Sequence, residues 1–231
     1  MAHPLDNVIW HALTTRHAKF AQGTGSARKF DPDVSPLAAV ENSQHESYAA
    51  MAGLLPVGDA IGLFLPEPYE PRAGWDLVAG GKLSQMVYGR DVELAAHDHL
   101  PADAELVRLG DADSPEMLEL TALTKPGPFL KRTHELGTYL GICREGKLVA
   151  MSGERLKVPG YTEVSAVCTH PDHLGKGYAG MLMTEVMRGI RGRGEIPFLH
   201  VLKDNSRAIA LYERLGFQER FLGHYAIIRK K

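Results

Sequence analysis

The feature that most constrains the fold is a glycine-rich turn between a predicted strand and a predicted helix. The turn runs from Thr169 to Gly180 and reads THPDHLGKGYAG. It follows a β-prone run and opens an amphipathic helix. Consecutive N–H groups at a helix N-terminus, aided by the helix dipole, bind phosphate oxygens without a side chain. The turn therefore predicts an anion site, although a helix start with purely structural glycines would have the same pattern.

Two familiar phosphate-binding motifs are excluded. Lys176 is followed by Gly177 and Tyr178, so the turn lacks the Gly-Lys-Ser/Thr of a P-loop. The next predicted strand ends at Leu202 and Lys203, where a dinucleotide-binding fold carries an acidic residue.

The elements around the turn follow in an order typical of a mixed α/β domain. We expect strands over 105–109, 138–144, 147–158, 161–169, 197–202 and 221–228, and helices over 117–124, 129–136, 177–191 and 205–215. The fold class is therefore predicted to be α/β, with a central mixed sheet and flanking helices.

The first hundred residues predict a smaller α/β region. We expect helices from about residue 8 to Phe20 and over 46–55, a strand over 61–65, and a hairpin of strands 75–79 and 83–88 turned by Gly80-Gly81. Residues 97–103 are polar, contain Pro101 and are expected to form a linker. This places a domain boundary near Leu100, between an N-terminal region (1–100) and a C-terminal domain (101–231).

Composition narrows the class of protein. The 26 basic and 28 acidic residues give a net charge of -2, which offers no general attraction for nucleic acid or an anionic membrane. No run approaches the ~18 apolar residues of a membrane span, and the first twenty residues lack the apolar core of a secretory signal. The two cysteines, Cys143 and Cys168, form no C-x-x-C pair and are expected to be reduced core residues. We therefore expect a cytoplasmic protein.

Two segments together resemble the GNAT superfamily of N-acetyltransferases, over roughly residues 106–228. The family's turn begins with Arg or Gln, followed by any two residues, a Gly, any one residue, and a Gly or Ala. The matching segment here is Leu174-Gly-Lys-Gly177-Tyr-Ala179. The family's Asn, Ala, Tyr, Gly-Phe segment is matched in spacing by Asn205, Ala208, Tyr212 and Gly216-Phe217. The departure is Leu174 in place of Arg or Gln.

The resemblance implies an acetyl-CoA-dependent N-acetyltransferase. The strand ending in Val167, Cys168 and Thr169 would pair its backbone with the pantetheine arm, and the Asn205 side chain would bind nearby. A plain helix N-cap is the structural alternative for Asn205. The pyrophosphate would lie on the turn formed by Leu174, Gly175, Lys176, Gly177, Tyr178, Ala179 and Gly180. Because the family binds this group mainly through backbone amides, Leu174 should leave the site intact.

Glu163 is the candidate base. An alkylamine with a pKa near ~10.4 needs a base or a desolvating pocket to react at neutral pH. Period-two alternation places Glu163 on the same side of its strand as Val167, and the resemblance to histone-type members implies a base at this strand position. The alternative is an exposed strand carboxylate in a salt bridge, and Glu154 on the preceding strand is the competitor.

Tyr212 is the candidate general acid for the leaving thiolate. It lies seven residues after Asn205, two helical turns, so that both side chains point one way. The family's general-acid Tyr falls at this position, and core packing with the hydroxyl at the rim is the alternative.

Other reactive residues are expected to be structural. His97-Asp-His99 and the pair His170 and His173 lack an evident third ligand, so we predict no metal. Cys168 lacks an evident His and carboxylate partnership for a ping-pong route. Arg188, Arg191 and Arg193 are predicted to be a solvated helix end, with a contact to the CoA 3′-phosphate as the alternative.

The acceptor is left open as an amine of a small molecule, amino acid or peptide, and the sequence does not address the oligomeric state. The alternatives to an enzyme are a catalytically silent acyl-CoA-binding regulatory module and a scaffold that binds no nucleotide. The N-terminal hundred residues lack both GNAT segments, which leaves two interpretations: a degenerate copy of the same fold, or a lid that supplies one wall of the acceptor site.

Overall fold

The structure is a computed structural model that describes residues 3–89, 94 and 100–231. Within these residues, eight strands form one large sheet in the order β4-β11-β5-β10-β9-β8-β7-β6. The strands are β4 (Ala60–Leu65), β5 (Trp75–Tyr88), β6 (Ala104–Leu109), β7 (Tyr139–Arg144), β8 (Lys147–Val158), β9 (Tyr161–Thr169), β10 (Ile196–Leu202) and β11 (Phe217–Lys230). The prediction of a mixed α/β fold is confirmed.

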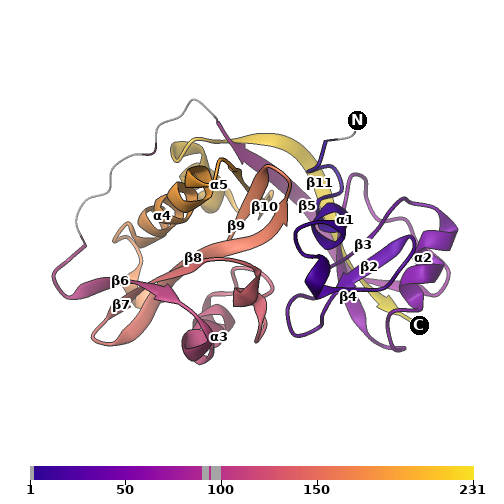
Figure 1. The fold of residues 1–231 in the computed structure, drawn as a ribbon, viewed down its shortest axis with the longest axis horizontal. Coiled ribbons are helices and arrows are strands. Elements are labelled where there is room, and N and C mark those ends of the chain that lie inside the picture. The colour runs from indigo at the N-terminus through magenta and orange to yellow at the C-terminus, as the bar shows by residue number, and fades with distance from the viewer. Residues whose placement is uncertain (1–2, 90–93, 95–99) are drawn as a thin grey trace.

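A smaller sheet and the helices complete the described chain. The sheet is β1 (Ala21–Gln22), β2 (Ala27–Phe30) and β3 (Ala38–Val40); the α-helices are α1 (Val8–Thr14), α2 (His45–Ala52), α3 (Ser114–Thr124), α4 (Tyr178–Gly192) and α5 (Ser206–Arg214). Single 3-10 turns lie at Ala18–Phe20, Asp111–Asp113, Thr133–Leu136 and Pro171–His173. Figure 1 shows α1, α2 and the small sheet near the C-terminus, and α4 and α5 toward the opposite end.

The helices cover both faces of the large sheet. Helices α4 and α5 pack on one face through a cluster that includes Met183, Met187 and Phe217. Helix α1 packs on the other face against Phe198 and Leu156. A ligand that extended between two strands of this sheet would therefore have one end on the face covered by α4 and α5 and the other end on the face covered by α1.

The predicted hairpin at Gly80-Gly81 is wrong, because β5 runs without a break from Trp75 to Tyr88. The two glycines serve close packing instead of a turn. A Cβ on Gly81 would lie 2.9 Å from the ring of Tyr225, and one on Gly80 would lie 3.1 Å from the carbonyl oxygen of Tyr225. The two glycines thus leave room for Tyr225 of β11.

Two predicted helices are shorter than expected. The first ends at Thr14 instead of near Phe20, and only a 3-10 turn follows over Ala18–Phe20. The piece predicted over 129–136 is reduced to a 3-10 turn at Thr133–Leu136. In the first case the chain leaves the helix so that His17 can bury its ring against β8.

The large sheet takes two of its described strands, β4 and β5, from before residue 100 and six from after it. Strand β5 lies between β10 and β11, so the early part of the chain contributes directly to the sheet that carries the glycine turn (Figure 1). The division of the chain into two domains near Leu100 stays a prediction.

Candidate active site

The glycine turn presents a run of unpaired backbone N–H groups. Gly175 and Gly177 both adopt a left-handed backbone, with φ of 77°, and α4 begins at Tyr178. The first helical hydrogen bond runs from the Met181 N–H to the Gly177 carbonyl, at 3.1 Å. Within the described chain, the N–H groups of 175–180 make no hydrogen bond. Such a cradle at a helix N-terminus suits an anion.

The strands that flank the turn part from each other. Strand β10 is parallel to β9 and pairs with it only from Ile196 to Phe198, opposite Tyr161 to Glu163. Beyond Phe198, β10 continues alongside β5, while β9 continues alongside β8. The edge of β9 that faces β10 is therefore open from Val164 to Thr169.

A pocket of about 480 Å³, here called the turn pocket, lies between the end of β9, the glycine turn and α5. Its volume is in the range of small-molecule sites. Its lining includes every predicted cofactor-binding residue and Tyr212: Val167, Cys168, Thr169, Leu174, Gly175, Lys176, Gly177, Tyr178, Ala179, Gly180 and Asn205. These predicted positions are thus brought together, although their roles stay predictions.

The turn pocket also has basic residues that the sequence analysis missed. Arg207 and Arg214 lie on α5 and line it together with Lys176. The two arginines are seven residues apart, so helical spacing places them on one face of α5, but not on the face of Asn205 and Tyr212, because residues two apart do not share a face. Arg188, Arg191 and Arg193 are not among its lining residues. Arg193 instead bonds Glu154 at 2.8 Å.

Asn205 and Tyr212 stand at the same side of α5. The Asn205 side chain accepts a hydrogen bond from the Ala208 N–H at 3.1 Å, so the N-cap role is present and the side chain still lines the turn pocket. Burial raises the pKa of Tyr212 to about 12. The Tyr212 hydroxyl therefore keeps its proton at neutral pH and can donate a hydrogen bond.

Glu163 does not line the turn pocket. Its carboxylate is fully buried and accepts two hydrogen bonds from Arg155, at 2.7 and 2.8 Å, and one from the Leu156 N–H at 3.2 Å. Burial alone would raise the pKa of Glu163, but the Arg155 charge and the hydrogen bonds from Arg155 and His200 hold it at about 2. Glu163 is therefore ionised and lies in a salt bridge.

The alternation that should have aligned Glu163 with Val167 is broken by a bulge in β9. Ala166 has a left-handed backbone, with φ of 53°, and the register with β8 shifts there. As a result Val164 and Val167, three residues apart, both pack into the cluster under α4 and α5. Glu163 precedes the bulge and lies on the opposite face, so the prediction of a shared side is wrong.

The competitor, Glu154, is also held in ion pairs. It is 1% exposed, lies 2.7 Å from Lys157 and 2.8 Å from Arg193, and accepts from the Thr138 N–H at 3.2 Å. It is not among the residues that line the turn pocket.

Cys168 lines the turn pocket but is poorly suited to act as a nucleophile. Burial raises the pKa of its thiol to about 11, so the thiolate is scarce at neutral pH.

The described residues contain no group of three His, Cys, Asp or Glu side chains arranged to hold a metal. His97 and His99 lie outside the described residues. None of the described helices is both long and apolar enough to cross a membrane.

The sequence analysis missed His200. It lies on β10 two residues after the last pairing with β9, and its Nδ1 is 2.7 Å from the Glu163 carboxylate. Its Nε2 is 3.1 Å from the Gln85 amide nitrogen. A single histidine in an apolar strand carries no sequence signal, because its partners lie 37 and 115 positions away.

Comparison with known proteins agrees with this geometry. The family model described as FR47-like protein matches residues 139–226. The N-alpha-acetyltransferase RimI of Mycobacterium tuberculosis is 32% identical over 133 residues, which cover 52% of this chain and 83% of that protein.

Solved structures agree as well. A putative GNAT-family acetyltransferase from Novosphingobium aromaticivorans aligns over 100% of both chains, with 36% identity and a TM-score of 0.90. A GCN5-related N-acetyltransferase from Kribbella flavida shares the fold at 17% identity, over 99% of this chain and 96% of that one, with a TM-score of 0.63.

The chain has an open strand edge beside a run of backbone N–H groups suited to phosphate, and it shares its fold with these proteins. These features define an acyltransferase. The chain belongs to the GNAT family of N-acetyltransferases. Acetyl-CoA is the cosubstrate of that family, and the unpaired N–H groups, the open edge of β9 and the cations of the turn pocket fit its pyrophosphate and pantetheine.

Proposed function

We propose that this protein transfers acetyl from acetyl-CoA directly to an amine of a small molecule, amino acid or peptide. The observation that carries the proposal is the turn pocket, in which the N–H cradle, the open edge of β9, Asn205 and Tyr212 line one space. The cradle from Leu174 to Gly180 would hold the pyrophosphate. The backbone of Val167 to Thr169 would pair with the pantetheine arm.

In this reaction Tyr212 acts as the general acid. A bond forms between the acceptor nitrogen and the thioester carbonyl carbon, the C–S bond breaks, and the electron pair leaves on sulfur. Tyr212, which keeps its proton at neutral pH, is the donor to that sulfur. The buried thiol of Cys168, with its raised pKa, favours direct transfer over a covalent acyl-enzyme.

The test has two arms. Isothermal titration with CoA and acetyl-CoA measures binding, and free-thiol release from acetyl-CoA across a panel of amines, amino acids and peptides measures transfer. We expect binding, and thiol release above hydrolysis with at least one acceptor class. Binding without release on any acceptor would favour a silent acyl-CoA-binding regulatory module. No binding would favour a scaffold.

A further inference from the structure

The face of the sheet opposite the turn pocket carries a buried His–carboxylate pair beside a second, narrow pocket. We propose that His200 is the catalytic base that takes the proton of the acceptor amine, that Glu163 positions it, and that the amine enters from the α1 face. This inference rests on the proposed acetyl transfer and assigns the acceptor side of that reaction.

The hydrogen bonds fix which nitrogen of His200 is basic. An ionised carboxylate only accepts, so Nδ1 of His200 donates to Glu163 at 2.7 Å. The Nε2 atom then carries the lone pair and accepts from the Gln85 amide nitrogen at 3.1 Å. The Gln85 amide is itself oriented, because its oxygen accepts from Arg220 at 2.8 Å and its nitrogen donates to the Leu5 carbonyl at 3.0 Å.

Packing and charge hold the imidazole in place. The ring lies 4.6 Å from the ring of Phe64 and 5.7 Å from that of Phe198, measured between centroids. Glu163 is held in turn by Arg155. A neutral imidazole oriented by a carboxylate on its other nitrogen is the arrangement of a general base, because the carboxylate stabilises the imidazolium that forms.

The position of His200 suits attack on a thioester held in the turn pocket. Strands β9 and β10 part immediately after Phe198. Leu199 and Val201 point toward the α4/α5 cluster that contains Tyr212, so His200 between them points to the other face. In this proposal the place where the strands part joins the two faces, and an acyl group that follows the edge of β9 reaches it from one side. The amine would reach it from the other.

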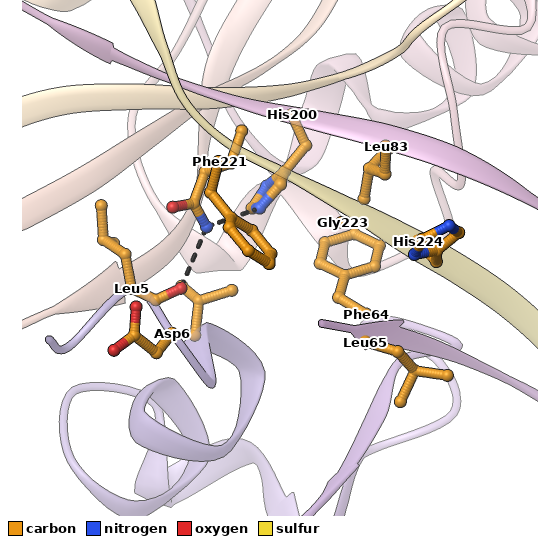
Figure 2. A pocket seen from close by; sticks show the side chains of 11 residues that line it. Leu5, Asp6, Phe64, Leu65, Leu83, His200, Phe221, Gly223 and His224 are labelled. Atoms are coloured by element: carbon orange, nitrogen blue, oxygen red, sulfur yellow. Dashed lines mark hydrogen bonds between the residues drawn. The ribbon is translucent and has the colours of Figure 1, made fainter. Parts of the chain in front are cut away.

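The pocket beside His200, here called the His200 pocket, indicates what kind of amine fits. Its apolar walls include Leu5, Phe64, Leu83 and Phe221, and Asp6 lies at the same opening (Figure 2). The enclosed space is about 20 Å³, room for one water-sized group. This suits the nitrogen of a primary amine whose neighbouring carbons contact the apolar walls, while Asp6 at the opening is ion-paired with Arg220.

Proton transfers at His200 and Tyr212 accompany the change of bonds. The neutral amine displaces the Gln85 amide from Nε2 of His200, attacks the carbonyl carbon through its lone pair, and passes its proton to Nε2. Tyr212 supplies a proton to the departing sulfur. His200 then releases a proton to solvent and Tyr212 regains one, so that amine and thioester become amide and thiol.

The first test is His200→Asn. The Asn side chain keeps an N–H donor toward Glu163 but has no basic nitrogen. We expect kcat at neutral pH to fall about 100-fold or more, with the acetyl-CoA dissociation constant unchanged by titration calorimetry. The rate should recover in part as the pH approaches the pKa of the acceptor amine. A kcat within a few-fold of wild type, with an unchanged pH profile, would overturn the role of His200.

The second test addresses the acceptor face and does not depend on a buried substitution. Phe221 is 38% exposed and lines the His200 pocket, and its neighbour Leu222 is 36% exposed and does not. Phe221→Ala should raise the acceptor KM several-fold while leaving the acetyl-CoA KM unchanged, and Leu222→Ala should change neither. Equal effects of the two variants, or a rise confined to the acetyl-CoA KM, would refute an acceptor site on this face.

These outcomes separate the two proposals. If the wild-type protein acetylates no amine, the proposed function fails and the role of His200 fails with it. If the wild type is active and the His200 and Phe221 variants behave like it, acetyl transfer stands and only the acceptor-side proposal is lost.

Discussion

Replacing His17 with Gln tests how the N-terminal region is fastened to the catalytic sheet. The imidazole is 3% exposed, and its Nε2 lies 2.8 Å from the Arg155 carbonyl oxygen and 3.1 Å from the Lys157 nitrogen. These contacts border the Arg155–Glu163 pair. Burial lowers the pKa of His17 to about 4, with the Lys157 and Lys19 charges acting in the same direction and the Arg155 carbonyl opposing them.

The direction of the pH effect follows from this lowered pKa. In the unfolded chain His17 takes up a proton near pH 6.5, whereas in the folded chain it does so only near pH 4. Its contribution to stability is fully present above pH 6.5 and is lost as the pH falls toward 4. At 1.36 kcal/mol for each pKa unit, the free energy of unfolding should fall by about 3 kcal/mol across this window. Glu163, with a folded pKa of about 2, contributes a separate loss below pH 4.5.

Urea unfolding of the wild type and of His17→Gln at several pH values between 7 and 4 measures this difference. Gln offers both a donor and an acceptor at the end of its side chain but does not titrate in this range. We expect the wild type to lose about 3 kcal/mol more than the variant between pH 6.5 and 4. Parallel losses in the two proteins would refute the assignment of the acid transition to His17.

Three further predictions concern the site and the sheet. Tyr212→Phe should lower kcat about 100-fold without changing the acetyl-CoA dissociation constant in calorimetry, and unchanged turnover would remove Tyr212 as the acid. Gly177→Ala should cost about 1–2 kcal/mol in thermal or urea unfolding, because φ is 77° there. It should also weaken CoA binding. The control Gly192→Ala, in which the new Cβ would meet no atom within 4 Å, should change neither the stability nor CoA binding. Gly153→Ala would place a Cβ 2.2 Å from the Tyr139 ring and should cost about 3 kcal/mol in urea unfolding; a loss under about 1 kcal/mol would contradict this packing.

The glycine turn, Asn205 and Tyr212 could be predicted as parts of one site because the chain builds these features locally. The glycines at 175 and 177, the cap at Asn205 and the seven-residue step to Tyr212 follow from backbone conformation and helical spacing. These features depend on neighbours within two turns of helix. The sequence alone therefore determined the fold class, the family and part of the lining of the turn pocket, whereas Arg207 and Arg214 were not predicted.

Only the tertiary structure decided the surroundings of Glu163. A single bulge at Ala166 reverses the side on which later residues of β9 point, and the sequence has no marker for it. The partners of Glu163 then come from other strands, with Arg155 on β8 and His200 on β10. Alternation along a strand predicts the face of the sheet on which a side chain lies only where the strand pairs regularly with its neighbour. Pairing between strands that are distant in the sequence depends on how the whole sheet packs. For that reason the sequence identified Glu163 as a reactive carboxylate, whereas the folded sheet paired it with His200.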